Sequence, residues 1–272
     1  MSSPILVIGP GAWGTALALA LAKNNQSVRL WGNDTEQMQA LIDERDNRFF
    51  LPGHPFPDNL TPYLTFDDAM EGVSDVLLVV PSHVFMTVVS QLKPYVKQRS
   101  LRLAWGTKGL HPSNGFLHQA IAQEVGELPM AVIAGPSFAS EVAQNLPTAV
   151  NVASTDAPFS QDLLKRFNSD NFRLFPSNDM VGVQLGSVVK NVLAVAVGIN
   201  DGLKLGSNAR SALMTMGLLG MNKLNIALGG ESKTLMDLAG MGDLVLTCTD
   251  DQSRNRRFGL ALGRGMSVDE AM

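Results

Sequence analysis

"VIGPGAWGTALALALA", residues 7–22, joins a short apolar run to a glycine-rich turn and then to a long apolar segment suited to a helix. Its glycines, Gly9, Gly11 and Gly14, have the spacing Gly-x-Gly-x-x-Gly. In a strand–turn–helix unit, the first glycine permits the tight turn, the second lets the backbone approach a pyrophosphate, and the third allows close helix–strand packing. The N-terminus of the helix then faces the anionic phosphates. The stretch therefore predicts a dinucleotide-binding site.

Two other interpretations of this stretch are weaker. A purely structural turn would leave Trp13 as a packing residue only. Gly9 and Gly14 also have the spacing of P-loop glycines, but Thr15 follows where a P-loop requires Lys. That difference disfavours hydrolysis of a nucleoside triphosphate.

The end of the next apolar run, "SVRLWGND" at residues 27–34, bears on the choice of dinucleotide. An acidic residue roughly 20 positions beyond the last glycine accepts ribose hydroxyls and favours NAD. Asp34 fits that spacing, but it can instead cap the following helix. Asn33 neither repels a 2′-phosphate nor binds it as a cation would. We expect NADP or NAD as cofactor, with a slight preference for NADP.

Apolar runs alternate with helix-compatible segments through the first half of the chain. The runs are near-continuous in Val, Ile and Leu, as expected for strands covered on both faces, and they occupy residues 4–9, 27–32, 74–82, 101–109, 130–136 and 148–155. The helical segments between them are residues 12–24, 34–45, 83–92, 115–127 and 137–145. This alternation predicts an α/β fold with a Rossmann-type, doubly wound parallel sheet. Residues 47–60, rich in Pro and Phe, are expected to form a long surface connection.

The pattern changes near residue 178. A helix at residues 156–168 and a strand at residues 171–178 come first, and beyond them we find helical patterns broken by glycines. We therefore predict an NAD(P)-binding domain at residues 1–178 and an all-helical substrate and catalytic domain at residues 179–272.

Composition limits the classes of partner. The formal net charge of −4 gives no support for a nucleic-acid partner. Cys248 is the single cysteine, so no intramolecular disulfide can form and a reducing compartment is expected. No Lys or Arg precedes the apolar N-terminal stretch and "GPG" interrupts it, which argues against a signal peptide. We expect a soluble cytoplasmic protein without stable membrane insertion. The four histidines have no metal-ligand spacing, so no metal site is expected.

"GVQLGSVVKNVLAVAVG", residues 182–198, carries a single charge, Lys190, in an otherwise apolar and small-residue helix. At helical spacing a stripe of small and polar residues lies beside Lys190, namely Gln184, Ser187, Asn191, Ala194 and Gly198. Such a stripe predicts the wall of a cavity. The alternative is that Lys190 extends its ammonium group to water at the edge of the domain.

Two later segments supply possible partners. Asp243 follows two glycines in "LAGMGDLVLTCT" and could pair with a lysine, or it could simply cap a helix. "DDQSRNRRFG" places Ser253, Arg254 and Asn255 in succession, and their donors suit a phosphate group. A solvated basic turn is the alternative for this run.

In the first domain, polar residues follow two of the predicted strands. "WGTKGL" places Lys108 in a glycine-flanked loop, and "AGPSFASEV" places Gly135, Ser137 and Ala139 at a strand-to-helix turn. Open α/β sheets bind ligands at the carboxyl ends of their strands. A histidine base is not excluded, since His83 also follows a strand, but lysine is the better candidate.

Six motifs resemble the bacterial type of the NAD(P)-dependent glycerol-3-phosphate dehydrogenase family: "GPGAWGTALA", "VVPSHVF", "WGTKGL", "IAGPSFASE", "GVQLGSVVKNV" and "GMGDLVLTCTDDQSRNRRFG". The resemblance implies hydride transfer between NAD(P)H and dihydroxyacetone phosphate, with Lys190 as general acid or base and Asp243 beside it. It implies substrate contacts from Lys108, Gly135, Ser137, Lys190, Asp243, Ser253, Arg254 and Asn255. It implies cofactor contacts from Gly9, Gly11, Ala12, Trp13, Gly14, Asn33, Lys108, Ala139 and Arg254. Relatives also suggest a homodimer that supplies the backbone of glycerophospholipids.

The sequence departs from the family in two places. Asn33 stands where the family often has a basic residue or His. The chain ends at "GMSVDEAM", where relatives continue with further helices, so we expect the helical domain to be incomplete. Two alternative hypotheses stay open. The first is a lysine-dependent β-hydroxyacid dehydrogenase, in which the Ser253–Asn255 cluster could bind the carboxylate of the substrate. The second is a non-catalytic dinucleotide sensor.

Overall fold

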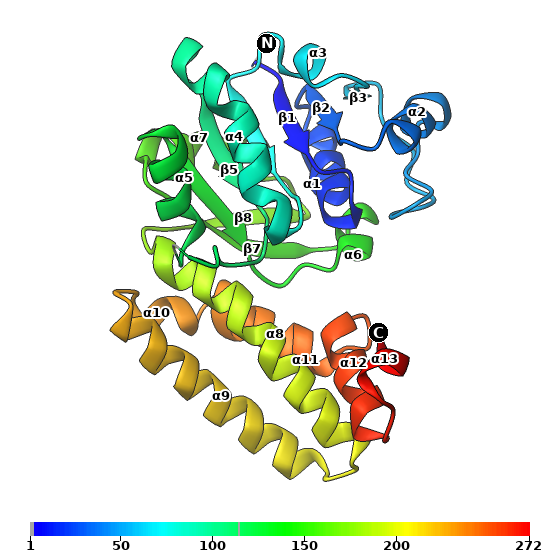
Figure 1. Ribbon diagram of the computed structural model, residues 1–272, viewed down its shortest axis with the longest axis vertical. Helices are drawn as coiled ribbons and strands as arrows, with labels where there is room; N and C mark the ends of the chain where they lie inside the picture. The colour runs from blue at the N-terminus through cyan, green and yellow to red at the C-terminus, as the bar shows by residue number, and fades with distance from the viewer. Residues whose placement is uncertain (1–2, 114) are drawn as a thin grey trace. The chain divides into compact units, whose positions relative to one another are not determined.

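The computed structural model describes residues 3–113 and 115–272 of the chain. Two compact units can be distinguished by their internal contacts (Figure 1). Unit 1 comprises Met1–Ile133 and Ser137–Asn178, within the described residues, and unit 2 comprises Ala134–Pro136 and Asp179–Met272. Unit 1 is a Rossmann-type α/β domain and unit 2 is helical. The predicted fold class is therefore confirmed.

One sheet of eight strands organises unit 1, in the order β3-β2-β1-β4-β5-β6-β7-β8. The strands are β1 (Ile5–Ile8), β2 (Val28–Trp31), β3 (Leu60–Pro62), β4 (Asp75–Leu78), β5 (Arg102–Trp105), β6 (Met130–Ala134), β7 (Thr148–Ser154) and β8 (Phe172–Ser177). β1 lies in parallel between β2 and β4, with Ile5 opposite Val28 on one side and Asp75 on the other. The direction of winding reverses at β1, which makes its carboxyl end the place where such sheets bind ligands.

One pairing in this sheet departs from the expected parallel arrangement. The N–H of Thr155, directly after β7, donates to the carbonyl of Met130 at the start of β6, with 2.9 Å between the two atoms. The end of β7 thus meets the start of β6, so these strands run in opposite directions. The connection between them holds only the five-residue helix α6 (Ala139–Ala143), which packs against α1 and does not carry the chain back along the sheet.

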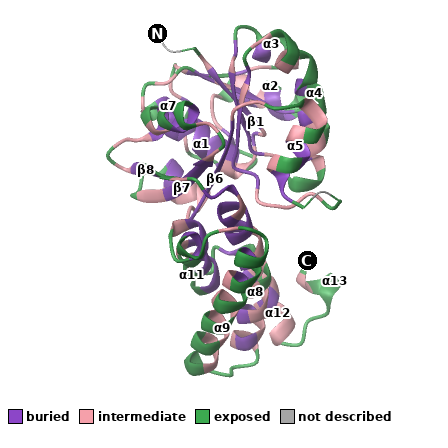
Figure 2. Ribbon diagram, turned by 90° about the vertical axis from the view of Figure 1, so that its left-hand side faces the viewer, coloured by how far each residue is buried: buried purple, intermediate pink, exposed green. Residues whose placement is uncertain are grey.

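Helices cover both faces of the sheet. They are α1 (Ala12–Lys23), α2 (Thr35–Glu44), α3 (Phe66–Met70), α4 (Ser82–Gln98), α5 (Leu117–Val125), α6, and α7 (Ala157–Phe167). α1 packs with α6 and α7, whereas α4 packs with α5. Figure 2 shows α1 and α7 on the opposite side of the buried strands from α4 and α5. α1 is buried from Gly14 to Ala22, so its apolar sequence reflects the core of unit 1 and not a membrane segment.

Three local predictions in unit 1 were wrong. α4 continues through Pro94 to Gln98, whereas we predicted that it ends at Leu92. The short elements β3 and α3 were missed. Residues 47–60 are not wholly a surface connection, since Asn47, Leu51 and Phe56 are buried beneath it.

Unit 2 is built around α8 (Met180–Gly202). The other helices are α9 (Ser207–Ala227), α10 (Ser232–Leu235), the π-helical turn η1 (Leu238–Gly242), α11 (Asp243–Thr249), α12 (Arg254–Gly263) and α13 (Val268–Ala271). α8 alone among the described helices is long and apolar enough to cross a membrane, by length and composition. Its packing against α9, α11 and α12 accounts for that apolar character in a folded domain.

α8 and α12 approach each other backbone to backbone. A Cβ on Gly198 would collide with the carbonyl of Arg256, and a Cβ on Gly259 would collide with the carbonyl of Val195. The expected cavity wall is therefore filled by α12 at the Gly198 end of the stripe. The polar members nearer the start of α8 are buried and bond within it, because Ser187 Oγ donates to the carbonyl of Gln184 at 2.8 Å.

An ion network closes the amino-terminal edge of the sheet in unit 1. Asp75 is fully buried and accepts from Arg102 Nε at 2.6 Å and from Arg166 Nη2 at 2.7 Å. Arg102 also reaches Asp162, which is 41% exposed, at 2.7 Å. The hydrogen bond from Arg102 holds the pKa of Asp162 below its ordinary value of 3.8.

We expect Asp75→Ala to lower the free energy of unfolding of unit 1 by about 3–5 kcal/mol, because two guanidinium groups then lose a buried counter-charge. Asp162→Ala is the matched control and should lower it by less than about 1 kcal/mol, since that pair is exposed to solvent. Urea unfolding followed by circular dichroism measures both values. Equal losses would contradict the role of Asp75.

Candidate active site

The turn that leaves β1 requires glycine at two positions. Gly9 has φ of +110°, and a Cβ there would collide with the carbonyl of Val79 at the end of β4. A Cβ on Gly14 would collide with the carbonyl of Gly9, so α1 could no longer lie against the turn. A Cβ on Gly11, by contrast, would meet nothing within 4 Å. The turn therefore leaves open space directly above Gly11.

The start of α1 is suited to an anion. Gly11 is its N-cap and supplies no side-chain acceptor to the first N–H groups of the helix. Such N–H groups, together with the positive end of the helix dipole, bind phosphates. The open space and the uncapped helix start fit the pyrophosphate of a dinucleotide.

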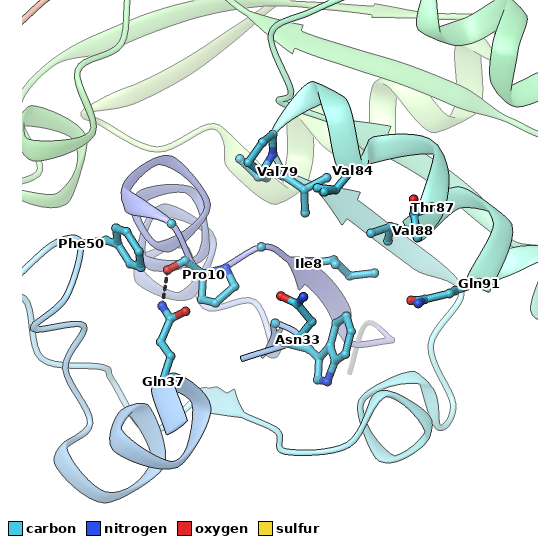
Figure 3. Close-up of a pocket in the computed structure, with 16 residues that line it drawn as sticks. Ile8, Pro10, Asn33, Gln37, Phe50, Val79, Val84, Thr87, Val88 and Gln91 are labelled. Carbon is cyan, nitrogen blue, oxygen red and sulfur yellow. Dashed lines mark hydrogen bonds between the residues drawn. The ribbon is translucent and has the colours of Figure 1, made fainter. Parts of the chain in front are cut away.

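A pocket of about 420 Å³ adjoins this turn in unit 1 (Figure 3). It is lined by Ile8, Gly9, Pro10, Gly11, Trp31, Gly32, Asn33, Gln37, Phe50, Val79, Val80, Pro81, Val84, Thr87, Val88 and Gln91. Its walls are the ends of β1, β2 and β4 and the first turns of α4. The size and apolar lining are typical of small-molecule sites. Every side chain in this set is uncharged, so the described lining neither attracts nor repels a 2′-phosphate by charge.

The two polar residues after β2 have different roles. Asp34 caps α2, because its Oδ1 accepts from the N–H of Gln37 at 3.0 Å. Asn33 lines the pocket and is exposed. Of the two candidates for contact with the adenosine ribose, Asn33 is thus the one placed in the pocket.

The remaining expected cofactor and substrate residues near the sheet lie at strand ends. Lys108 is half-buried in the loop after β5, where Thr107 Oγ1 donates to the carbonyl of Val80 at 2.8 Å and ties that loop to the end of β4. Trp13 packs against the same loop, since its indole nitrogen would lie only 2.8 Å from a Cβ on Gly106. Gly135, Ser137 and Ala139 follow β6.

Unit 2 contains a buried charge pair. Lys190, 3% exposed in α8, forms an ion pair with Asp243, 1% exposed at the start of α11. Lys190 Nζ also donates to Thr247 Oγ1 at 3.1 Å. Thr247 lies one turn after Asp243 on the same face of α11, which is why both reach the same ammonium group. The structure thus brings Lys190 and Asp243 together. The alternative, in which Lys190 extends its ammonium group to water, does not hold because the side chain is buried.

Thr247 was missed by sequence reasoning. Its only signal was a hydroxyl four residues after Asp243 in an apolar helix. Asn255 Nδ2 donates to Asn191 Oδ1 at 2.9 Å, so the start of α12 is joined to the residue beside Lys190.

The basic cluster at the start of α12 divides into two groups. Arg256 is buried and pairs with Asp201 and Asp251, so it serves the packing of unit 2. Ser253 is the N-cap of α12 and accepts from the N–H of Arg256 at 3.2 Å. Arg254 is exposed and, with Asn255, lines a hollow of about 490 Å³. Arg257 lines the same hollow, and Asn255 Nδ2 already donates to Asn191.

Hydrogen bonds also set the charge state of Asp201. Burial alone would raise its pKa, but the hydrogen bonds from Arg210, Asn200 and Arg256 outweigh burial and bring the pKa below its ordinary value of 3.8. Among the described residues, no three His, Cys, Asp or Glu side chains lie together in a way that could hold a metal ion.

A Rossmann-type sheet with an open glycine turn and an uncharged pocket at its reversal point defines a dinucleotide-binding domain, and with the helical unit it is the architecture of a two-domain dehydrogenase. Family models described as NAD-dependent glycerol-3-phosphate dehydrogenase N-terminus and C-terminus match residues 4–160 and 179–272. The chain belongs to the NAD(P)-dependent glycerol-3-phosphate dehydrogenase family. It is an oxidoreductase of that type, with NAD or NADP as cofactor and a small-molecule substrate.

Individual relatives agree. Glycerol-3-phosphate dehydrogenase [NAD(P)+] of Coxiella burnetii (strain Dugway 5J108-111) is 53% identical over 98% of this chain and 80% of that protein. The enzyme of Actinobacillus pleuropneumoniae serotype 3 (strain JL03) is 50% identical over 100% of this chain and 81% of that protein. A crystal structure of glycerol-3-phosphate dehydrogenase from Coxiella burnetii has a TM-score of 0.96 at 52% identity, covering 99% of this chain and 83% of that one.

Cys248 follows Thr247 and lies in the core of unit 2. Burial raises the pKa of its thiol from 9.0 to about 11. Because the thiolate is the reactive form, we expect iodoacetamide at pH 8 to alkylate Cys248 only as unit 2 unfolds. Mass spectrometry along a urea series should show alkylation rising together with the loss of helical circular dichroism. Rapid alkylation of the native protein would contradict this burial.

The raised pKa of Cys248 also determines how the stability of unit 2 changes at alkaline pH. The thiol ionises more readily in the unfolded chain than in the folded one. Its contribution to stability is therefore fully present below pH 9 and is lost as the pH rises from 9 towards 11.

Proposed function

We propose that this chain interconverts dihydroxyacetone phosphate and sn-glycerol 3-phosphate, with Lys190 as the general acid and base. The observation that carries the proposal is the buried Lys190–Asp243 pair with Thr247 beside it. Bound NAD(P)H would supply the hydride for the carbonyl carbon. The chain itself must then deliver one proton to the substrate oxygen and hold the substrate in place.

Lys190 is suited to the proton transfer. Its ammonium group has three donors, and Asp243 and Thr247 fix its orientation by one ion pair and one hydrogen bond. In the reduction, we propose that this ammonium gives a proton to the oxygen as the carbonyl becomes an alcohol. The resulting amine regains a proton from water. In the oxidation, the amine takes the proton from the alcohol.

We propose that the phosphate of the substrate binds Arg254, Ser253 and Asn255. Their donors lie at or beside the N-terminus of α12, where the helix dipole favours an anion. Further substrate contacts are proposed for Lys108, Gly135 and Ser137. Cofactor contacts are proposed for Gly9, Gly11, Ala12, Trp13, Gly14, Asn33, Lys108, Ala139 and Arg254.

Since the described pocket lining carries no charge, we propose that NADH and NADPH are both accepted; the slight preference for NADP expected from the sequence has no cation there to support it. A cytoplasmic homodimer that provides the glycerol phosphate of phospholipids completes the proposal. Its support is the resemblance to the family.

We expect Lys190→Ala to lower kcat by about 10²–10⁴-fold, while the Kd for NADH stays unchanged. The absorbance of NADH and of NADPH, followed in parallel with dihydroxyacetone phosphate, measures kcat and compares the two cofactors. Lys233→Ala removes an exposed lysine of unit 2, 81% exposed, and serves as the control with unchanged kcat. Near-normal turnover by Lys190→Ala would show that the proton comes from another group.

We expect Arg254→Ala to raise KM for dihydroxyacetone phosphate by about 10- to 100-fold, as the loss of a charge-assisted contact predicts. KM for unphosphorylated dihydroxyacetone should change far less. Arg264→Ala removes an exposed arginine at the other end of α12 and is the control. If both substrates were affected equally, Arg254 would not bind the phosphate.

A further inference from the structure

The carbonyl of Pro10, in the centre of the glycine turn, is held by two side-chain amides. Asn47 Nδ2 donates to it at 2.8 Å, and Gln37 Nε2 donates to it at 2.8 Å (Figure 3 shows the second of these). Asn47 is fully buried and Gln37 is 8% exposed. Both come from outside the turn, so tertiary structure and not the turn itself fixes this carbonyl.

Asn47 joins the turn to two more parts of the site. Its Nδ2 also donates to Thr15 Oγ1 in α1 at 2.7 Å. Its Oδ1 accepts from the N–H of Phe50 at 3.2 Å, and Phe50 lines the pocket. One side chain therefore connects the glycine turn, the first helix and the aromatic wall of the pocket.

The orientation of the Pro10 carbonyl decides where the next N–H points. In a trans peptide the carbonyl of Pro10 and the N–H of Gly11 point in opposite directions. Turning the carbonyl towards Asn47 and Gln37 therefore turns the N–H of Gly11 away from them. A carbonyl in the opposite orientation would present an oxygen, and not a donor, to an approaching phosphate.

The local sequence cannot hold this peptide by itself. Pro10 lies between Gly9 and Gly11, and glycine allows many backbone conformations at little energetic cost. The ring of Pro10 fixes only its own φ, so the Pro10–Gly11 peptide can still turn about ψ of Pro10 and φ of Gly11. Hydrogen bonds from outside the turn are needed to select one orientation.

We propose that Asn47, assisted by Gln37, is a positioning residue for the pyrophosphate of the cofactor. It acts through the Pro10 carbonyl and does not itself touch the phosphates. The segment after α2 thereby contributes to cofactor binding through a buried amide.

The test compares Asn47→Ala with Asn59→Ala. Asn59 Nδ2 also donates to two backbone carbonyls, those of Ala22 and Gln26 at 2.8 Å each, but near the opposite end of α1 from the glycine turn. The Kd for NADH, from quenching of intrinsic tryptophan fluorescence in the full chain, should rise at least about tenfold in Asn47→Ala and stay within about twofold in Asn59→Ala. A similar rise in both variants would reduce Asn47 to a structural residue and overturn the proposal.

A second variant and a second ligand keep the test decisive. If Asn47→Ala does not fold, Gln37→Leu removes one of the two bonds to Pro10 and should still weaken NADH binding. In whichever variant folds, binding of ADP-ribose, which carries a pyrophosphate, should weaken more than binding of AMP, which does not. Equal weakening of both ligands, or unchanged NADH binding in Gln37→Leu when it alone folds, would overturn the proposal.

Discussion

The backbone of α1 lies against the turn that leaves β1 at a separation that no side chain permits. Gly14 has no Cβ to strike the carbonyl of Gly9, and Gly9 has none to strike the carbonyl of Val79. These two contacts bring α1, β1 and β4 together at the point where the winding of the sheet reverses. The open space above Gly11, the uncapped start of α1 and the pocket beside them all depend on that approach.

Much of the fold could be predicted from the sequence because apolar runs alternate with helix-compatible segments along the first half of the chain. Seven of the strands gave clear apolar runs bounded by turn residues, and the change to helices after residue 178 was visible from the patterns alone. β3 and α3, of three and five residues, were missed. The direction of β7 depends on how the chain crosses from α6, which local patterns do not record.

The residues of the candidate site could likewise be predicted only in part. Lys190 and Asp243 were suggested as a pair because a charge in an apolar helix needs a partner. Thr247 joins them across 57 positions of sequence, and only the packing of α11 on α8 reveals that contact. Asn47 was hidden for a different reason, since a Pro- and Phe-rich segment indicates an exposed loop and gives no sign of one buried amide. Arg256 is the opposite case. It belongs to a basic cluster in the sequence, and nothing in that cluster indicated that its side chain is buried.

The contact between α8 and α12 affects how far the two helices can move relative to each other. Where helices meet through long side chains, rotamer changes can absorb a small displacement. Here Gly198 and Gly259 place main chain against main chain, and rigid peptide groups leave no such compliance. A ligand pulling on Arg254 at the start of α12 would therefore shift α8 along with it. The two helices therefore fix the distance between Lys190 and Arg254, the group proposed to hold the phosphate.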